Sequence, residues 1–286
     1  MSNQALTLIE CPRDAMQGWK TFIPTEKKIG YINSLLQCGF DTLDFGSFVS
    51  PAAIPQMADT KEVLAGLRME DTDTSLLAIV ANLRGAKEAS KYSPITYLGF
   101  PFSVSETFQL RNTNSTREES LERVKEIQDI CLQTNKQLVI YLSMGFGNPY
   151  GDPWSEDLVY QWADKIAGLG IKIISLADTV GLATPEQVFS MTDQLVGQLP
   201  DHSIGVHLHS TPFNRQAKID AAWQAGCRRF DGALKGIGGC PMAGDELVGN
   251  MDTEWMIPYF REKGLLKELN MDALQTSLQI ASEIFI

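Results

Sequence analysis

The chain has 286 residues, a length that suits one α/β barrel of about 250 residues. Its formal net charge of −11 repels phosphate backbones, which argues against nucleic acid as a partner. No apolar run approaches the ~18 residues of a membrane span, and the five cysteines show no paired spacing. We therefore expect a cytoplasmic protein with free thiols and no membrane contact.

Short apolar runs rich in β-branched residues recur along the chain, and several are apolar almost throughout, as in LVIYLS and IKIISLA. Such runs are typical of strands that are buried on both faces of a parallel sheet. We predict eight strands, at Ala5–Glu10, Phe40–Phe45, Ser75–Val80, Ile95–Phe100, Gln137–Ser143, Ile171–Leu176, Ser203–His209 and Arg229–Leu234.

Amphipathic segments separate these runs, and several begin with a residue suited to an N-cap. Thr116 is followed by Glu119 in the spacing of a capping box, and Thr184 is followed by Pro185 at the first helical position. Thr25 and Ser155 are the other predicted N-caps. Further helices are expected at Phe213–Ala225, Thr253–Lys263 and Met271–Ile286.

Eight strands alternating with eight helices predict a parallel sheet closed as a single TIM (β/α)8 barrel over residues 1–286, with an extra C-terminal helix. An open, doubly wound sheet is the alternative, but the chain has no linker-like stretch that would divide it. It also has no GxGxxG or P-loop motif, and the glycines after the last strand have the wrong spacing for a dinucleotide site.

In a barrel of this type the chemistry lies on the loops that follow the strands. Polar residues gather at these positions after nearly every predicted strand. They are Arg13, Asp14, Gln17, Asp44, Asn82, Tyr141, Ser143, Asp178, His207, His209, Cys240 and Asn250.

His207 and His209 are two of only three histidines in the chain. Residues two apart on a strand face the same side, so both imidazoles would point into the mouth of the barrel. Facing one carboxylate, that of Asp14, they would form a cation site. Their nitrogen and oxygen donors suit Mg²⁺, Mn²⁺, Zn²⁺ or Fe²⁺ in an open site.

These residues together resemble 3-hydroxy-3-methylglutaryl-CoA lyase, within the wider group of metal-dependent barrel lyases and Claisen-type condensing enzymes. The similarity covers almost the whole chain. It is carried by ECPRDAMQ at 10–17, FGSFVSPAAIPQMADTKEVLAGL at 45–67, ANLRGAKEA at 81–89, LADTVGLATPEQV at 176–188, VHLHST at 206–211 and GIGGCPMAG at 236–244.

The resemblance implies a divalent cation, Mg²⁺ or Mn²⁺ with Zn²⁺ as a further option, bound by Asp14, His207, His209 and Asn250. It implies that Arg13 stabilises the enolate of an acyl-CoA thioester.

The resemblance also implies that Cys240 takes part in proton transfer, although a plain exposed thiol in a glycine-rich loop is the alternative. Asp178 or a histidine at the metal is the candidate base for the substrate hydroxyl. Asp44 is a further candidate catalytic residue near the substrate, and Gln17, Tyr141, Ser143 and Asn82 are expected to bind the substrate.

Four stretches depart from the family's pattern. The family's HxHDTYGQ is replaced by HLHSTPFN at 207–214, and a glutamate in the second strand is replaced by Asp44. The arginine expected before Tyr141 is absent, and Asp245–Val248 replaces a small glycine-rich loop. The departures concern the acyl pocket, so they leave the acyl group of the substrate open.

We therefore expect a lyase that cleaves 3-hydroxy-3-methylglutaryl-CoA, or a related 3-hydroxyacyl-CoA, to acetyl-CoA and a keto acid such as acetoacetate. Two alternatives stay open: an enzyme that condenses an acyl-CoA with a keto acid, and a metal-free barrel without activity. The oligomeric state is open as well, with a homodimer as the first option.

Overall fold

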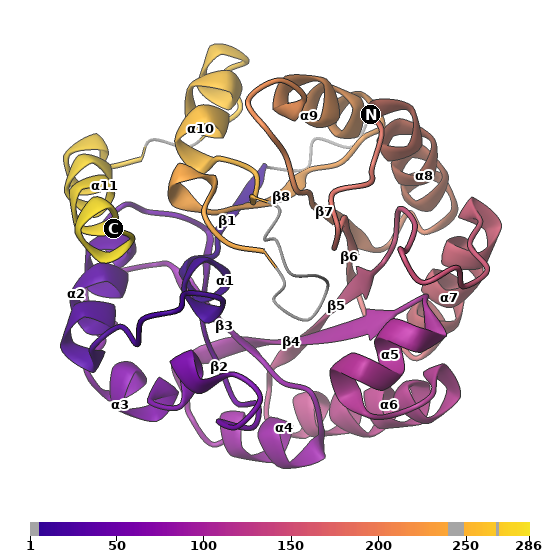
Figure 1. The fold of residues 1–286 in the computed structure, drawn as a ribbon, viewed down its shortest axis with the longest axis horizontal. Helices are drawn as coiled ribbons and strands as arrows, with labels where there is room; N and C mark the ends of the chain where they lie inside the picture. The colour runs from indigo at the N-terminus through magenta and orange to yellow at the C-terminus, as the bar shows by residue number, and fades with distance from the viewer. Residues whose placement is uncertain (1–5, 240–248, 267–268) are drawn as a thin grey trace.

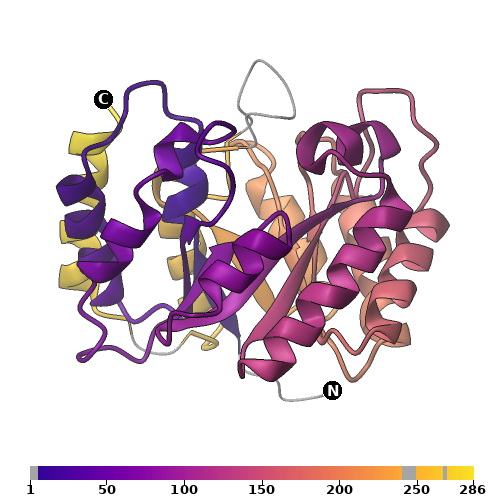
Figure 2. The ribbon, with the colours of Figure 1, turned by 90° about the horizontal axis from the view of Figure 1, so that it is seen from below.

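The computed structural model describes residues 6–239, 249–266 and 269–286, which form a closed barrel of parallel strands inside a ring of helices (Figures 1 and 2). Each strand pairs with the next along the chain, and the last pairs with the first. The strands are β1 (Thr7–Glu10), β2 (Thr42–Ser47), β3 (Ser75–Ile79), β4 (Ile95–Ser103), β5 (Gln137–Ser143), β6 (Ile173–Ala177), β7 (Ser203–His207) and β8 (Arg229–Gly232).

The helices surround the strands (Figure 1). They are α1 (Pro12–Gln17), α2 (Thr25–Leu36), α3 (Thr60–Ala65), α4 (Leu83–Ala89), α5 (Glu106–Thr113), α6 (Arg117–Gln133), α7 (Glu156–Gly168), α8 (Pro185–Gln198), α9 (Arg215–Gln224), α10 (Thr253–Glu262) and α11 (Met271–Ile284). Helices α1 to α9 lie between successive strands of the chain, and α10 and α11 follow β8. Short 3-10 turns occupy Pro55–Met57 and Leu234–Gly236. The predicted barrel and its extra C-terminal helix, α11, are confirmed.

Alternate residues of each strand pack on opposite sides of the barrel wall, as the two-residue period of a strand requires. The larger core lies between the strands and the helices. In this core the ring centroids of Phe230 on β8 and Phe260 on α10 are 4.9 Å apart. A smaller cluster, which includes Leu77, Val139 and Tyr141, fills the inside of the barrel. None of the described helices is both long and apolar enough to cross a membrane.

The predicted strand positions are confirmed, with bounds that differ by a few residues; the predicted start at Ala5 lies outside the described residues. The seventh strand is shorter than predicted, because the chain beyond His207 leaves the barrel wall. His209 instead forms an antiparallel bridge with Asn250, and Met251 N donates to Leu208 O at 3.0 Å. The eighth strand ends at Gly232, before the turn at Leu234–Gly236.

The N-caps were predicted correctly at Thr116, Ser155 and Thr184, and Thr116 and Thr184 both form full capping boxes. The prediction for Thr25 was wrong. Pro24 occupies the N-cap position, and the Thr25 hydroxyl donates to Asp59 Oδ2 at 2.8 Å, so its side chain ties two segments together.

Glu10, at the end of β1, is a buried carboxyl group that links the first strand to the end of the barrel sequence. Its carboxylate accepts hydrogen bonds from Leu234 N at 2.9 Å and from the Thr253 hydroxyl at 2.6 Å, so it joins β1 to the segments that follow β8. Burial raises the pKa of Glu10 to about 8, although the Thr253 and Leu234 hydrogen bonds lower it.

This pKa predicts a pH-dependent contribution to stability. A carboxyl whose pKa is raised on folding holds its proton more tightly in the folded chain. Its contribution is full below 4.5, the pKa of an ordinary glutamate, and is lost as the pH rises toward about 8. The shift corresponds to roughly 5 kcal/mol.

Glu10→Gln should remove this dependence, because glutamine has nothing to ionise. Urea unfolding at about pH 5 and about pH 8 measures it. The free energy of unfolding of the parent should fall more over this interval than that of the variant. Equal losses in the two proteins would show that the buried carboxyl does not titrate there.

Candidate metal centre at the mouth of the barrel

A cavity of about 340 Å³ opens where the strands end. Eight of the predicted site residues line it, and they come from helix α1, from strands β5 and β7 and from the segments after strands β3 and β7: Arg13, Asp14, Gln17, Asn82, Tyr141, Ser143, His207 and His209. Asp44, Asp178 and Asn250 are buried but do not line the cavity. Cys240 and Asp245–Val248 lie outside the described residues.

Arg13 joins two buried carboxylates at the wall of this cavity. Its Nε donates to both oxygens of Asp44, at 3.1 and 3.0 Å, and its Nη2 donates to Asp44 as well. Its Nη1 donates to Asp14 Oδ1 at 3.0 Å and to Gln17 Oε1 at 2.7 Å. Among the described residues, these contacts leave the second N–H of Nη2 unused, so the cavity wall keeps one guanidinium donor for a ligand.

The short helix α1 explains why these groups meet. Arg13 and Gln17 are four residues apart and lie on the same helical face. Gln17 also donates from Nε2 to Asp14 Oδ1 at 2.8 Å, so its amide bonds both neighbours. The Gln17 amide therefore links the Arg13 guanidinium and the Asp14 carboxylate through one hydrogen bond to each.

The Asp14 carboxylate is held in its charged form. Burial raises its pKa, but Arg13, His207, His209 and Asn250 together outweigh burial and lower the pKa to about 2. A carboxylate with so low a pKa is an anion at any physiological pH. It is therefore ready to bind a cation.

The two histidines face this carboxylate. One ligand atom from each of Asp14, His207 and His209 lies within 4.8 Å of the others, and all three residues are buried. His207 Nδ1 lies 3.2 Å from Asp231 Oδ2, which leaves Nε2 as the nitrogen available to a cation. Burial lowers the pKa of His207, but the hydrogen bond and charge of Asp231 raise it above the ordinary value overall.

These residues fit a divalent cation. Two imidazoles and one ionised carboxylate form a nitrogen–oxygen donor set, and their exposure to the cavity keeps open positions for a substrate or water. Neutral imidazole is required for ligation, and Asp231 orients His207 as carboxylates commonly orient metal-binding histidines.

Asn250 lies directly beside Asp14. Its Nδ2 donates to Asp14 Oδ2 at 2.7 Å and to Ile237 O at 2.9 Å. Gly238 makes this approach possible: its φ is +115°, and a Cβ there would lie 2.5 Å from Asn250 Nδ2. The structure therefore places Asn250 next to the centre, and its role as a ligand stays a prediction.

The remaining predicted substrate residues differ in what holds them. The Tyr141 ring stands edge-on to the His207 ring, with centroids 5.8 Å apart. Ser143 is buried in the cavity wall. Asn82 Oδ1 accepts from Gly85 N at 2.9 Å, so this side chain caps α4 at the cavity rim. Its position has a structural explanation that needs no substrate.

Asp178 is tied away from the cavity by a lysine. Its Oδ2 accepts from Lys218 Nζ at 2.8 Å, and its Oδ1 accepts from Ala183 N at 3.0 Å. Lys218 Nζ also donates to His209 O at 2.7 Å, and both charged side chains are only 1% exposed. The pair therefore fixes the backbone of a predicted metal ligand.

Sequence reasoning missed three residues near the centre: Asp231, Cys11 and Lys218. An acidic residue inside an otherwise buried strand, as in RFDG of β8, is a signal that could have identified Asp231. Cys11 was noticed only as a thiol. Lys218 carries no sequence signal, because a lysine in an amphipathic helix is usually exposed.

The comparisons with known proteins agree with this geometry. The HMGL-like family model matches residues 8–280. The chain is 32% identical to a hydroxymethylglutaryl-CoA lyase of Bacillus subtilis over 95% of this chain and 90% of that protein. It is 33% identical to the cytoplasmic 3-hydroxy-3-methylglutaryl-CoA lyase of Rattus norvegicus, over 89% of this chain and 73% of that protein.

Solved structures give the same result. An HMG-CoA lyase from Acinetobacter baumannii, in complex with coenzyme A and 3-methylmalate, is 34% identical with a TM-score of 0.90, covering 98% of this chain and 91% of that one. An HMG-CoA lyase from Brucella melitensis is 31% identical with a TM-score of 0.90, covering 99% of each chain.

The metal centre predicts which substitutions abolish cation binding. His207→Ala and Asp14→Ala each remove one donor of the three and should lower the affinity for Mn²⁺ by more than about 100-fold, since even outer-shell changes cost 10–100-fold. His202→Ala is the matched control, because His202 precedes β7 at the opposite end of the strand. Titration of Mn²⁺ followed by electron paramagnetic resonance measures the affinity. Unchanged Mn²⁺ binding by both site variants would refute the centre.

Proposed function

Because the chain belongs to the HMGL-like family, we propose that it is a metal-dependent carbon–carbon lyase that cleaves 3-hydroxy-3-methylglutaryl-CoA to acetyl-CoA and acetoacetate. One observation carries the proposal. Arg13 is hydrogen-bonded to Asp14, and Asp14 lies next to His207 and His209 in the same cavity. This arrangement supplies a fixed guanidinium beside a cation site. Cleavage next to a tertiary alcohol needs both.

A divalent cation bound by Asp14, His207 and His209, with Asn250 as the proposed fourth ligand, would supply Lewis-acid chemistry to the substrate oxygens. Mg²⁺ or Mn²⁺ is the proposed ion, because the donor set contains hard oxygen and imidazole nitrogen. The residues of the chain hold that ion and orient the substrate around it.

Arg13 is the proposed stabiliser of the thioester enolate. Its second Nη2 N–H is left unused by the described residues, while Asp44 and Asp14 fix the guanidinium plane. A donor that is already oriented costs no reorganisation when charge develops on the substrate oxygen. The chain therefore presents a positioned donor before any substrate arrives.

The base that takes the hydroxyl proton is proposed to be a histidine of the metal centre. Because a neutral imidazole has one lone pair, that histidine would accept the proton at the nitrogen that it releases from the cation. Asp178 was the other candidate, but Lys218 and Ala183 hold both of its oxygens, and it does not line the cavity. For Asp178 to act, Lys218 would first have to withdraw.

The proton that completes acetyl-CoA is proposed to come from Cys240, on the evidence of the family resemblance alone. The proposed thioester would enter from the cavity rim. Arg111 lies there, exposed and with its guanidinium 4.6 Å from the centre of the Tyr150 ring. In a chain of net charge −11, a rim cation offsets the repulsion of an anionic substrate.

Direct assay tests the function. The purified protein with Mg²⁺ or Mn²⁺ should release acetyl-CoA and acetoacetate from 3-hydroxy-3-methylglutaryl-CoA, and chelation should stop the reaction. A panel of related 3-hydroxyacyl-CoA thioesters, analysed by mass spectrometry, identifies the preferred acyl group. Turnover of acetyl-CoA and a keto acid into a condensed product, without cleavage, would instead support a condensing enzyme.

Arg13→Lys tests the proposed enolate stabiliser. Lysine keeps the charge but loses the planar fork that bonds Asp44 and a ligand together. We expect kcat to fall by about 10²–10³, as when one oxyanion donor is removed. Mn²⁺ binding should persist. Arg84→Lys on the exposed face of α4 is the matched control. An Arg13→Lys protein with unchanged kcat would limit Arg13 to a structural role.

A further inference from the structure

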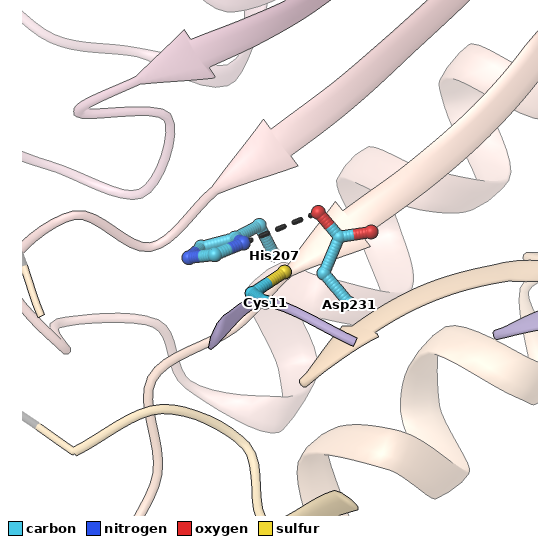
Figure 3. A group of neighbouring side chains, drawn as sticks. All are labelled: Cys11, His207 and Asp231. Carbon is cyan, nitrogen blue, oxygen red and sulfur yellow. Dashed lines mark hydrogen bonds and ion pairs between the residues drawn. The ribbon is translucent and has the colours of Figure 1, made fainter. Parts of the chain in front are cut away.

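A second group of side chains that could hold a metal ion shares one residue, His207, with the metal centre. Cys11, His207 and Asp231 each offer a ligand atom, and these three atoms lie within 4.8 Å of one another (Figure 3). Figure 3 shows the Cys11 sulfur beside the contact between His207 and Asp231, where Nδ1 and Oδ2 are 3.2 Å apart. The backbone holds the group together, because Cys11 N donates to Gly232 O at 2.8 Å.

Two polar atoms at this group have no hydrogen-bond partner among the described residues. They are Asp231 Oδ1 and Tyr141 Oη; Asp231 is 3% exposed and Tyr141 is 8% exposed. The Tyr141 ring stands edge-on to the His207 ring, with centroids 5.8 Å apart, so this tyrosine borders the group. Buried polar atoms are nearly always paired, and an orphaned group points to an ion or water that belongs there.

We propose that Cys11, His207 and Asp231 form a second cation site, suited to a thiophilic divalent ion such as Zn²⁺ or Cd²⁺. Thiolate, imidazole and carboxylate are three ligand types of Zn²⁺, and the soft sulfur selects against Mg²⁺. Ligand atoms in a tetrahedral Zn²⁺ site are roughly 3.5 Å apart, and the three atoms here lie within 4.8 Å of one another, so binding requires only a small contraction of the group. Tyr141 Oη or a water supplies the fourth position.

We call the proposed site of Cys11, His207 and Asp231 the lower site, and the centre of Asp14, His207 and His209 the upper site. The charges balance at the lower site. Cys11 gives up its thiol proton when the sulfur–metal bond forms, so one proton is released to solvent. The thiolate and the Asp231 carboxylate then neutralise the two positive charges of the ion. A buried ion with matched charge avoids the cost of an isolated charge in an apolar interior.

Occupation of the lower site disables the upper one. A neutral imidazole has one nitrogen with a free lone pair and one that carries a proton. When the lower ion takes Nδ1 of His207, the proton moves to Nε2, which faces Asp14 and His209. The upper site then loses one of its three donors. The lower site is therefore inhibitory, and His207 belongs to one cation at a time.

The thiolate gives the lower site a spectroscopic signature. Cd²⁺ bound to a cysteine thiolate absorbs in the near ultraviolet through sulfur-to-metal charge transfer. The titration uses a Cys240→Ser background, so that this second thiol does not contribute. We expect one Cd²⁺ per chain with a charge-transfer band, and loss of the band in Cys11→Ala and Cys11→Ser. Cys131→Ala, which removes another buried thiol on α6, is the matched control.

Displacement of Mn²⁺ tests the antagonism. Cd²⁺ added to the Mn²⁺-loaded protein should release free Mn²⁺, and Cys11→Ala should raise the Cd²⁺ concentration required by more than about 10-fold. Asp14→Asn, which weakens the upper site, should keep the Cd²⁺ band. If Cd²⁺ competes only at the upper site, Cys11→Ala will release Mn²⁺ as the parent does. That result, or a band that survives Cys11→Ala, overturns the proposal. Neither readout depends on lyase activity.

Discussion

The contact on which the mouth of the barrel depends is the guanidinium of Arg13 between two buried carboxylates. Arg13 satisfies Asp44 on one side and Asp14 on the other, and Gln17 closes the arrangement. Burying three charges is expensive, and removal of one partner from such a group typically costs about 3–5 kcal/mol. The same contacts help to keep Asp14 anionic and hold the Arg13 guanidinium in the cavity wall.

The strand register of the closed barrel then determines which side chains lie next to Asp14. In the parallel pairing of β7 with β8, His207 is opposite Asp231, and Asp231 is in turn opposite Ile9 of β1. Side chains that are far apart in sequence are therefore neighbours at one level of the barrel wall. One histidine lies between the upper carboxylate, Asp14, and the lower one, Asp231, and its two nitrogens face different partners.

The sequence predicted the features that depend on local pattern. The run Gln137–Ser143 is apolar through most of its length and follows the polar pair Asn135 and Lys136, and the strand has these bounds. His207 and His209 both line the cavity as predicted, although His209 lies beyond the end of β7 in a segment that the prediction had assigned to the strand. The remaining contacts depend on long-range register. Asp231 bonds a residue 24 positions away, and Lys218 bonds one 40 positions away. No local pattern encodes such distances, and Cys11 stood beside the predicted site without any sign of its partners.

Lys218 illustrates how one buried side chain changes the chemistry that a shared fold supports. An ammonium that is 1% exposed must be paired, and Lys218 is paired with Asp178 and the His209 carbonyl. The ion pair lowers the tendency of the Asp178 carboxylate to bind a proton, although burial raises its pKa overall. A carboxylate with both oxygens engaged is a poor proton acceptor for a substrate that it cannot reach. Asp178 thus acts on the site through Lys218, which fixes the segment after β7 that carries His209, and proton transfer is left to the groups that face the cavity.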